Sequence, residues 1–295
     1  MEKTINMIII KLLGGLGNQL FQYALGRNIA QKNKTQLKLD ITPFDTYSKH
    51  RYGLNHFNIL ENLATSQEVS RYKKYDTQTK IGKLFNLIES LKPLKSRAYI
   101  KEPYFYGYFS EVLNLGDNIY LDGFWQSEKY FKDIENILRD EFTIKEKLED
   151  NLLNAIMSTN SVSIHVRRAD YVTNPSANKI YGVCSLDYYN NAVSKITRLV
   201  RTPHFFIFSD DLAWCKNNIR LNFPTTFIDH GADKNYEDLI LMSKCKHNII
   251  ANSSFSWWGA WLNDNPDKII IAPEKWLKDP NRTTEDLIPS GWLKI

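Results

Sequence analysis

The chain has 295 residues, of which 43% are hydrophobic and 24% charged, with a formal net charge of +5. This composition is that of a globular protein long enough for two domains, and it excludes a disordered chain and a nucleic-acid-binding arm. The three cysteines, Cys184, Cys215 and Cys245, are odd in number and form no CxxC pair. They therefore indicate a reducing compartment and no cysteine-based metal site.

The N-terminal apolar run is interrupted by Lys11 and soon reaches glycine, and no later segment is long and apolar enough to span a bilayer. We therefore expect a cytoplasmic protein without an integral membrane anchor. Residues 71–101 differ from the rest because they carry nine Lys or Arg against two acidic residues. We favour a solvated helix whose apolar residues pack into the domain. The alternative is a basic amphipathic helix in peripheral contact with the inner membrane face.

The first half opens with a strand, a glycine turn and a helix. Residues 7–13 form an apolar run, Gly14 and Gly15 follow it, and helical periodicity begins at Leu16. This order is typical of the first unit of a nucleotide-binding α/β domain. We predict further strands at 36–40 and 119–123 and a helix at 128–139, and we expect the basic, Tyr-rich residues 41–118 to be irregular.

The second half alternates strands with helices. Strands are predicted at 161–166, 204–209, 225–228, 247–251 and 268–272, and helices at 146–158, 187–200, 211–217, 236–244 and 254–262. Such alternation predicts a mainly parallel, doubly wound sheet, in which ligands bind beyond the carboxyl ends of the strands. We place the boundary near residue 150, which gives an N-terminal domain of residues 1–150 and a C-terminal domain of residues 151–295.

The first motif is the glycine turn, which reads Gly-Gly-Leu-Gly-Asn-Gln from Gly14 to Gln19. Glycines at a strand-to-helix turn let backbone amides approach a ligand, and Asn18 and Gln19 supply groups suited to sugar hydroxyls. The spacing is not GxGxxG, which argues against an NAD-dependent oxidoreductase. A tight turn without a ligand is the alternative.

The second motif, HVRRADY, begins at His165 at the end of a strand. Alternate strand residues face the same side, so Arg167 can reach a ligand while Arg168, on the other side, braces the loop through Asp170. The fork of a guanidinium matches phosphate oxygens and can stabilise a departing nucleotide diphosphate. A structural Arg–Asp pair is the alternative.

Two further motifs follow strands. Asp210 and Asp211 invite a metal interpretation, but no histidine or third carboxylate accompanies them, and one of them is well placed to cap the next helix. The run ANSSFSWWG, which begins at Ala251, places Asn252, Ser253 and Ser254 at a helix start, where hydroxyls and free amides can bind an anion. Capping alone is the alternative.

Four blocks taken together, GGLGNQLFQYA, GFWQSEKYF at 123–131, HVRRADY and ANSSFSWWGAWL at 251–262, resemble the bacterial α-1,2-fucosyltransferases of glycosyltransferase family 11. The resemblance implies a GT-B-like fold of two Rossmann-like domains, with the acceptor on the N-terminal side and the donor on the C-terminal side. It also implies inverting transfer from GDP-β-L-fucose to the 2-hydroxyl of a glycan such as a β-galactoside of lipopolysaccharide O-antigen. No cofactor, metal or nucleic acid is implied.

By this resemblance Arg167 binds the donor pyrophosphate, with a base drawn from Asp170 or His165. The other expected donor contacts are Arg168, Asp210, Asp229, Asn252, Ser253, Ser254, Phe255, Gly15, Asn18 and Gln19. The alternatives are an α-1,6-type fucosyltransferase or a transferase with another donor, and a non-catalytic glycan-binding protein. The last would leave the paired arginines unexplained.

Overall fold

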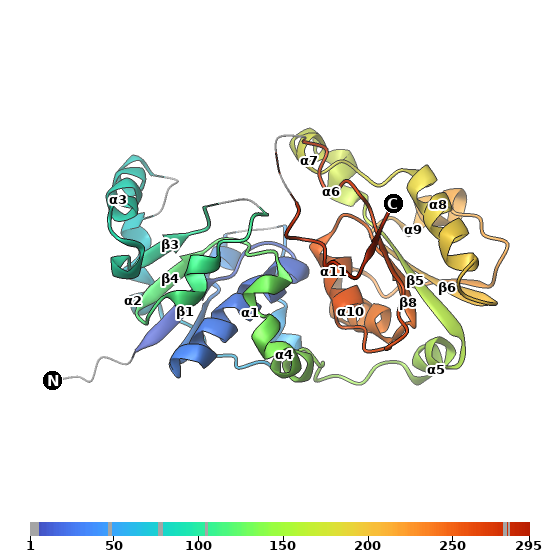
Figure 1. Cartoon of the computed structure of the whole chain (residues 1–295), viewed down its shortest axis with the longest axis horizontal. Helices are drawn as coiled ribbons and strands as arrows, with labels where there is room; N and C mark the ends of the chain where they lie inside the picture. The colour runs from blue at the N-terminus through green and yellow to red at the C-terminus, as the bar shows by residue number, and fades with distance from the viewer. Residues whose placement is uncertain (1–5, 47–48, 76–78, 104–105, 280–281, 283) are drawn as a thin grey trace. The chain divides into compact units, whose positions relative to one another are not determined.

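The structure is a computed structural model that describes residues 6–46, 49–75, 79–103, 106–279, 282 and 284–295. The chain forms two compact units, drawn in Figure 1: unit 1 is Met1–Phe142 with Glu285–Leu287, and unit 2 is Thr143–Thr284 with Ile288–Ile295. The sequence placed the boundary near residue 150 and assigned everything after it to the second domain. In the structure the chain leaves unit 1 at Phe142, and a short C-terminal segment returns to it.

Unit 1 is built on a four-stranded sheet with the order β2-β1-β4-β3, and each described strand pair in it is parallel. Its strands are β1 (Met7–Lys11), β2 (Gln36–Asp40), β3 (Tyr99–Lys101) and β4 (Ile119–Asp122). Its helices are α1 (Leu16–Asn33), α2 (Ser66–Ser70), α3 (Lys80–Leu91) and α4 (Glu135–Glu141), and several short 3-10 turns join these elements.

The predicted strand, glycine turn and helix at the start of unit 1 are confirmed. The three isoleucines of β1 are buried, and α1 lies directly on β1 and β2. A Cβ on Gly26 of α1 would lie 2.8 Å from Leu37 Cδ1 and 3.2 Å from Ile10 Cβ, so glycine is what allows this close approach. The glycine turn is thereby held rigidly at the carboxyl end of β1.

The region 41–118, expected to be irregular, contains α2, α3 and β3. Three of its tyrosines and Tyr120 of β4 account for part of the high aromatic content: Tyr72 stacks on Tyr120, Tyr120 on Tyr99, and Tyr99 on Tyr75, with ring centroids 5.0–5.4 Å apart. Stacked rings at this distance stabilise a core beyond the burial of their area. These tyrosines therefore pack the sheet of unit 1 and do not form an open sugar-binding platform.

Unit 2 is built on a six-stranded sheet with the order β10-β9-β8-β5-β6-β7, again with parallel pairs among the described strands. Its strands are β5 (Asn160–Val166), β6 (Pro203–Ser209), β7 (Thr225–Phe227), β8 (His247–Ile249), β9 (Ile270–Ala272) and β10 (Leu293–Lys294). Its helices are α5 (Asp150–Ser158), α6 (Ala169–Thr173), α7 (Pro175–Ile180), α8 (Leu186–Thr197), α9 (Leu212–Asn218), α10 (Asn235–Lys244) and α11 (Ser254–Trp261).

Helices cover both faces of the sheet in unit 2. On one face Ile164 and Phe205 pack with residues of α8 and α9, and on the other Phe206 and Phe208 pack with residues of α5 and α10. Strand residues alternate between the two clusters because successive side chains of a strand point to opposite faces. The predicted parallel, doubly wound α/β architecture is confirmed.

Three local predictions differ from the structure. The helix expected at 128–139 consists of two 3-10 turns followed by α4, because Phe131 leaves helical geometry (φ −145°, ψ 13°) and buries its ring. The helix expected from residue 146 begins at Asp150. The short helices α6 and α7 were not predicted, and α6 changes the interpretation of the arginine motif.

Candidate functional site

The strand order of unit 2 reverses between β5 and β8. From β5 the chain adds β6 and β7 on one side, and then crosses to add β8 and β9 on the other. Such a reversal leaves a crevice outside the carboxyl ends of the two central strands, where ligands of open parallel sheets bind. Arg167 follows β5 and Asn252 follows β8, and the hydroxyl of Tyr171 reaches the carbonyl of Asn252 at 3.5 Å. The fold thus brings two of the predicted motifs together at this point.

Arg167 is held in position by two carboxylates and an aromatic ring. Its Nη1 lies 2.9 Å from Asp210 Oδ2 and its Nη2 lies 2.5 Å from Asp170 Oδ1, while its Cζ lies 5.3 Å from the centre of the Tyr171 ring. Asp210 is itself fixed, because its Oδ1 accepts hydrogen bonds from the backbone amides of Arg168 (2.8 Å) and Ala169 (3.3 Å). The guanidinium fork is therefore oriented, and 24% of the side chain is still exposed.

The expected pairing of Arg168 with Asp170 is wrong. Arg168 Nε lies 3.2 Å from Asp211 Oδ2, and its Cζ lies 4.0 Å from the centre of the Trp214 ring. Strand alternation ends at Val166 and α6 begins at Ala169, so the helical turn carries Asp170 back to Arg167. Asp211 also accepts a hydrogen bond from the Trp214 amide, which confirms the predicted cap of α9.

The cluster contains two arginines and three aspartates, so its acidic groups outnumber its basic groups. An anion that approaches Arg167 must therefore compete with a carboxylate. Asp170 is the carboxylate that can leave, because its side chain is 39% exposed, against 22% for Asp210, and because Asp210 is anchored by two backbone amides. Asp170 is therefore the more accessible of the two carboxylates that pair with Arg167.

His165 lies inside the protein, one residue before the end of β5. Burial, with a smaller effect from the charge of Arg167, lowers the pKa of its imidazole to about 3, so the ring is neutral at physiological pH. Its ring centroid lies 5.4 Å from that of Phe255, and its Nδ1 has no hydrogen-bond partner among the residues that the structure describes. Such an enclosed, neutral imidazole is a poor base.

The block that opens α11 has several different roles. Ser253 caps the helix by accepting a hydrogen bond from the Phe255 amide at 3.3 Å. Asn252 is buried, and its amide donates to the carbonyls of Tyr181 (3.0 Å) and Trp276 (3.2 Å), so this side chain joins two loops. The tryptophans that follow, Trp257 and Trp258, are fully buried. The hydroxyls of Ser253 and Ser254 and the first amides of α11 are the groups suited to an anion.

A polar pair that sequence reasoning missed lies after β7. Asp229 was expected at the site and is exposed close to the end of this strand. The next residue, His230, places Nδ1 2.7 Å from Oδ1 of Asp238 on α10. Burial raises the pKa of the Asp238 carboxyl to about 6. The spacing of the two residues does not distinguish them from a surface pair, and only the fold brings them together.

Unit 1 has its own reversal of strand order, between β1 and β4. The glycine turn follows β1, and the loop that begins at Gly123 follows β4. Asn18 Oδ1 accepts a hydrogen bond from Gln126 Nε2 at 2.7 Å, which joins the two motifs at the carboxyl edge of this sheet. The blocks GGLGNQ and GFWQS, far apart in the sequence, are therefore in contact in unit 1.

The predicted residues of the glycine turn have different roles. Gln19 is buried and donates to the carbonyls of Gly14 and Arg51, both at 2.9 Å, while its oxygen accepts from the amide of Gly53 at 2.9 Å. Gln19 therefore holds the loop that passes beside the turn. Gly15 is the N-cap residue of α1 and is half-buried. Asn18 is half-buried as well.

A half-buried carboxylate shapes the loop after β4. Glu102 accepts hydrogen bonds from the amides of Phe124 (2.6 Å) and Trp125 (3.0 Å), and burial raises the pKa of this carboxyl to about 7. A Cβ on Gly123 would lie 2.4 Å from Glu102 Cβ. The glycine therefore allows Glu102 to approach the loop and fix its amides.

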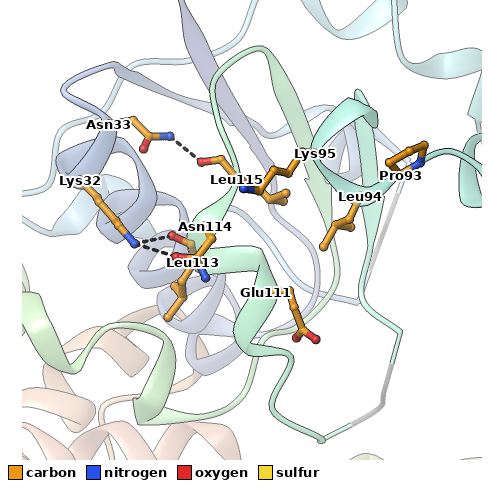
Figure 2. A pocket seen from close by; sticks show the side chains of 9 residues that line it. All are labelled: Lys32, Asn33, Pro93, Leu94, Lys95, Glu111, Leu113, Asn114 and Leu115. Atoms are coloured by element: carbon orange, nitrogen blue, oxygen red, sulfur yellow. Dashed lines mark hydrogen bonds between the residues drawn. The ribbon is translucent and has the colours of Figure 1, made fainter.

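A hollow of roughly 650 Å³ lies elsewhere in unit 1 (Figure 2). Its lining includes Asn33 at the end of α1 and Leu115 before β4, so it lies toward the amino ends of the strands. Lys32 projects there and donates to the carbonyl of Leu113 and to Asn114 Oδ1. None of the sequence motifs contributes to this hollow. Across the described part of the chain, no group of three or more His, Cys, Asp or Glu is placed to hold a metal ion.

The two α/β units, each with a parallel sheet and with polar motifs at the carboxyl edge of that sheet, form a GT-B-like fold. Solved structures agree: the NodZ α-1,6-fucosyltransferase soaked with GDP-fucose matches with a TM-score of 0.51 at 15% identity, over 88% of this chain and 93% of that chain. Fucosyltransferase NodZ from Bradyrhizobium matches with a TM-score of 0.50 at 13% identity, over 87% of this chain and 92% of that chain. At these identities the likeness concerns the fold alone.

The model of the family described as glycosyl transferase family 11 matches residues 7–295, and the chain belongs to this family of glycosyltransferases. It is 35% identical to an α-1,2-colitosyltransferase of Escherichia coli over 300 residues, which cover 98% of this chain and 99% of the relative. It is 34% identical over 310 residues to the O-antigen biosynthesis glycosyltransferase WbnK of Escherichia coli, covering 96% and 99%. A gorilla galactoside α-(1,2)-fucosyltransferase 1 is 26% identical over 175 residues, covering 55% and 48%. The interpretations as an oxidoreductase or a non-catalytic glycan-binding protein are set aside.

Proposed function

We propose that this glycosyltransferase moves L-fucose from GDP-β-L-fucose to the 2-hydroxyl of a β-galactoside glycan, with inversion to an α-1,2 linkage. One observation carries the proposal: Arg167, oriented by Asp210, lies at the strand reversal of unit 2 across from the start of α11. A rigid guanidinium fork beside a helix N-terminus suits a pyrophosphate. The α-1,2 relatives in the family support the linkage.

In this proposal the residues of unit 2 bind the leaving group. Arg167 and the first amides of α11 hold the two phosphates, and the hydroxyls of Ser253 and Ser254 add donors. Asp210 keeps the Arg167 guanidinium oriented. Arg168 pairs with Asp211 and so holds the start of α9 in place. The contacts strengthen as the bond between fucosyl C1 and the β-phosphate oxygen breaks, because negative charge then accumulates on GDP.

Asp170 is the proposed base. The pyrophosphate replaces it at Arg167, because Asp170 is the more exposed of the two paired carboxylates. The released carboxylate accepts the proton of the acceptor 2-hydroxyl while the hydroxyl oxygen forms the new bond to C1. His165 is the weaker candidate, since burial lowers the pKa of its ring to about 3.

The transfer needs no metal ion in this proposal. Both acidic residues after β6 are already engaged, since Asp210 accepts two backbone amides and pairs with Arg167, while Asp211 pairs with Arg168 and caps α9. Charge on the leaving diphosphate is met by Arg167 and backbone amides, which can replace a divalent ion in this role.

The 35% identity to an α-1,2-colitosyltransferase supports a second candidate donor, GDP-colitose. Colitose is L-fucose without its 3-hydroxyl, so the two donors differ by one polar group. A site built to hydrogen-bond that hydroxyl discriminates strongly against the analogue that lacks it. The choice between fucose and colitose is therefore a question of whether such a partner exists, and it is decided by direct comparison of the two donors.

The test measures GDP release with GDP-fucose and GDP-colitose against a β-galactoside and its 2-deoxy analogue. We expect release with GDP-fucose and the β-galactoside, an α-1,2 product by NMR, and no transfer to the 2-deoxy sugar. Faster release with GDP-colitose would replace the donor assignment and keep the linkage. A product linked through a primary hydroxyl would favour the α-1,6-type alternative, and equal transfer to the 2-deoxy acceptor would refute the proposed linkage.

A further inference from the structure

Helix α3 of unit 1 carries its large apolar side chains on the outside. Each of these residues is between 40% and 79% exposed, and they are Ile81, Leu84, Phe85, Leu87, Ile88 and Leu91. On a helix of 3.6 residues per turn they form one continuous apolar face. Figure 1 shows α3 at the β3 end of the sheet of unit 1. The interpretation favoured from the sequence, in which these residues pack into the domain, is wrong.

The polar face of α3 is the one that packs against unit 1. Gly82 and Glu89 are the buried residues of the helix, and Asn86, one turn from each, is half-buried. Glu89 accepts hydrogen bonds from the Tyr75 hydroxyl (3.2 Å) and the Ala98 amide (2.6 Å), and pairs with Lys92 Nζ at 2.6 Å. These bonds fix the rotation of the helix, so its apolar face is held outward by specific contacts.

The charge around this face has one sign. From Thr79 to Lys101 inclusive, the sequence has six Lys or Arg and a single acidic residue, which is the buried Glu89. Lys80 and Lys83 are exposed on α3, and Lys92 and Lys95 follow its end. An exposed helix with an apolar face, a basic rim and no exposed carboxylate has the plan of a helix that lies in the surface of an anionic bilayer.

We propose that α3 binds peripherally to an anionic lipid surface, with its apolar face in the boundary between headgroups and acyl chains and its lysines among the headgroups. The observation that selects lipid over a protein partner is charge complementarity, because the segment from Thr79 to Lys101 presents exposed lysines and no exposed carboxylate, which matches a uniformly negative surface. At 1.5 Å per residue, the 12 residues of α3 extend about 18 Å, which suits a helix lying in the surface. Among the described helices, none is long and apolar enough to cross the bilayer.

The test is co-sedimentation of the whole chain with phosphatidylcholine vesicles that contain about 30% phosphatidylserine, compared with pure phosphatidylcholine vesicles. We expect binding to the anionic vesicles at low salt, weaker binding as salt rises, and little binding to the neutral ones. Leu84→Gln with Leu91→Gln should reduce partitioning at least tenfold, and Lys80→Glu with Lys83→Glu should do the same, since each basic residue contributes about fivefold near an anionic surface.

Matched controls change the same chemistry on unit 2. Met157→Gln with Leu199→Gln removes two exposed apolar residues, and Lys195→Glu with Lys216→Glu reverses two exposed lysines. Both controls should bind vesicles like the unchanged chain. All variants should keep its melting temperature and its affinity for GDP. With the fold and GDP binding unchanged, a failure of vesicle binding tests the membrane proposal alone, and a failure of GDP binding tests the proposed function alone.

Three outcomes would overturn the proposal. The first is that the unchanged chain stays in the supernatant with anionic vesicles at low salt. The second is that the α3 variants bind as well as the controls. The third is concentration-dependent self-association, without vesicle binding, that Leu84→Gln with Leu91→Gln abolishes. That result would assign the face to a second copy of the chain.

Discussion

Replacing Arg167 by alanine separates two contributions of this residue: the contribution of its ion pairs to stability, and its contribution to the rate of transfer. Stability should fall by only about 1 kcal/mol, because Asp210 keeps its two backbone amide donors and Asp170 is well exposed to water. The transfer rate should fall far more. Loss of a preorganised contact to developing charge costs about 3 kcal/mol, which is roughly a hundredfold in rate.

The assay measures initial GDP release with donor and acceptor, GDP affinity by calorimetry, and the melting temperature of each variant. Arg167→Lys should also be poor, because an ammonium keeps the charge but cannot contact Asp210 and two phosphate oxygens through one planar fork. Arg198→Ala serves as the matched control, since Arg198 is exposed just after α8. This control should keep the activity and stability of the unchanged chain.

Two results would refute the reasoning. Turnover in a folded Arg167→Ala protein within about threefold of the unchanged chain would show that Arg167 binds no developing charge. A collapse of the melting temperature, in contrast, would show that Arg167 mainly holds the loop after β5 together. In that case the loss of activity would say nothing about the donor.

The remaining predictions concern the proposed base, the metal and the loop after β4. Asp170→Asn should leave GDP affinity unchanged or slightly tighter, since a competing carboxylate is removed, while the transfer rate falls at least a hundredfold; an unchanged rate in kinetic assays would exclude Asp170 as the base. Transfer should survive EDTA, and a complete loss restored by Mn²⁺ or Mg²⁺ would return the two aspartates after β6 to a metal role. Gly123→Ala should destabilise the protein by about 1–3 kcal/mol in thermal unfolding, because its Cβ would lie 2.4 Å from Glu102 Cβ. Gly116→Ala, whose Cβ meets nothing within 4 Å, should be near neutral, and equal effects of the two would contradict this packing argument.

Strand ends and glycine turns could be read from the sequence because they are set by local chemistry. The apolar run before Gly14 and the strand that ends at Val166 are predicted by apolar periodicity and by the residues that end each run. Neither signal depends on distant residues. Because strands and helices alternate, each sheet is expected to be parallel, and each motif is then expected at the carboxyl edge of its own sheet. The position of the candidate site was therefore predictable, and the order of the strands at that edge was not.

The partners of individual side chains depended on contacts that the sequence does not encode locally. The pairing of Arg167 with Asp170 requires the helical turn of α6, which the strand pattern did not anticipate. Asn18 and Gln19 are neighbours of similar chemistry. Asn18 accepts a hydrogen bond from Gln126, whereas Gln19 donates to the backbone carbonyls of Gly14 and Arg51. Periodicity likewise identified the apolar face of α3, but it could not say whether that face turns inward, because this is decided by what Glu89 bonds.

The return of Glu285–Leu287 to unit 1 has a consequence for synthesis of the chain on the ribosome. Asp286 accepts a hydrogen bond from the Tyr108 amide at 3.0 Å, its carbonyl accepts one from the Ser127 hydroxyl at 2.6 Å, and its carboxylate pairs with Lys129. Residues up to Phe142 of unit 1 are translated first. Glu285–Leu287, which complete unit 1, are translated only after nearly all of unit 2. At typical elongation rates the delay is on the order of 10–30 s, during which this part of unit 1 waits with unsatisfied donors. A chain that ends at Thr284, and so lacks Glu285–Leu287, should therefore be more open to protease near Tyr108 than the finished protein.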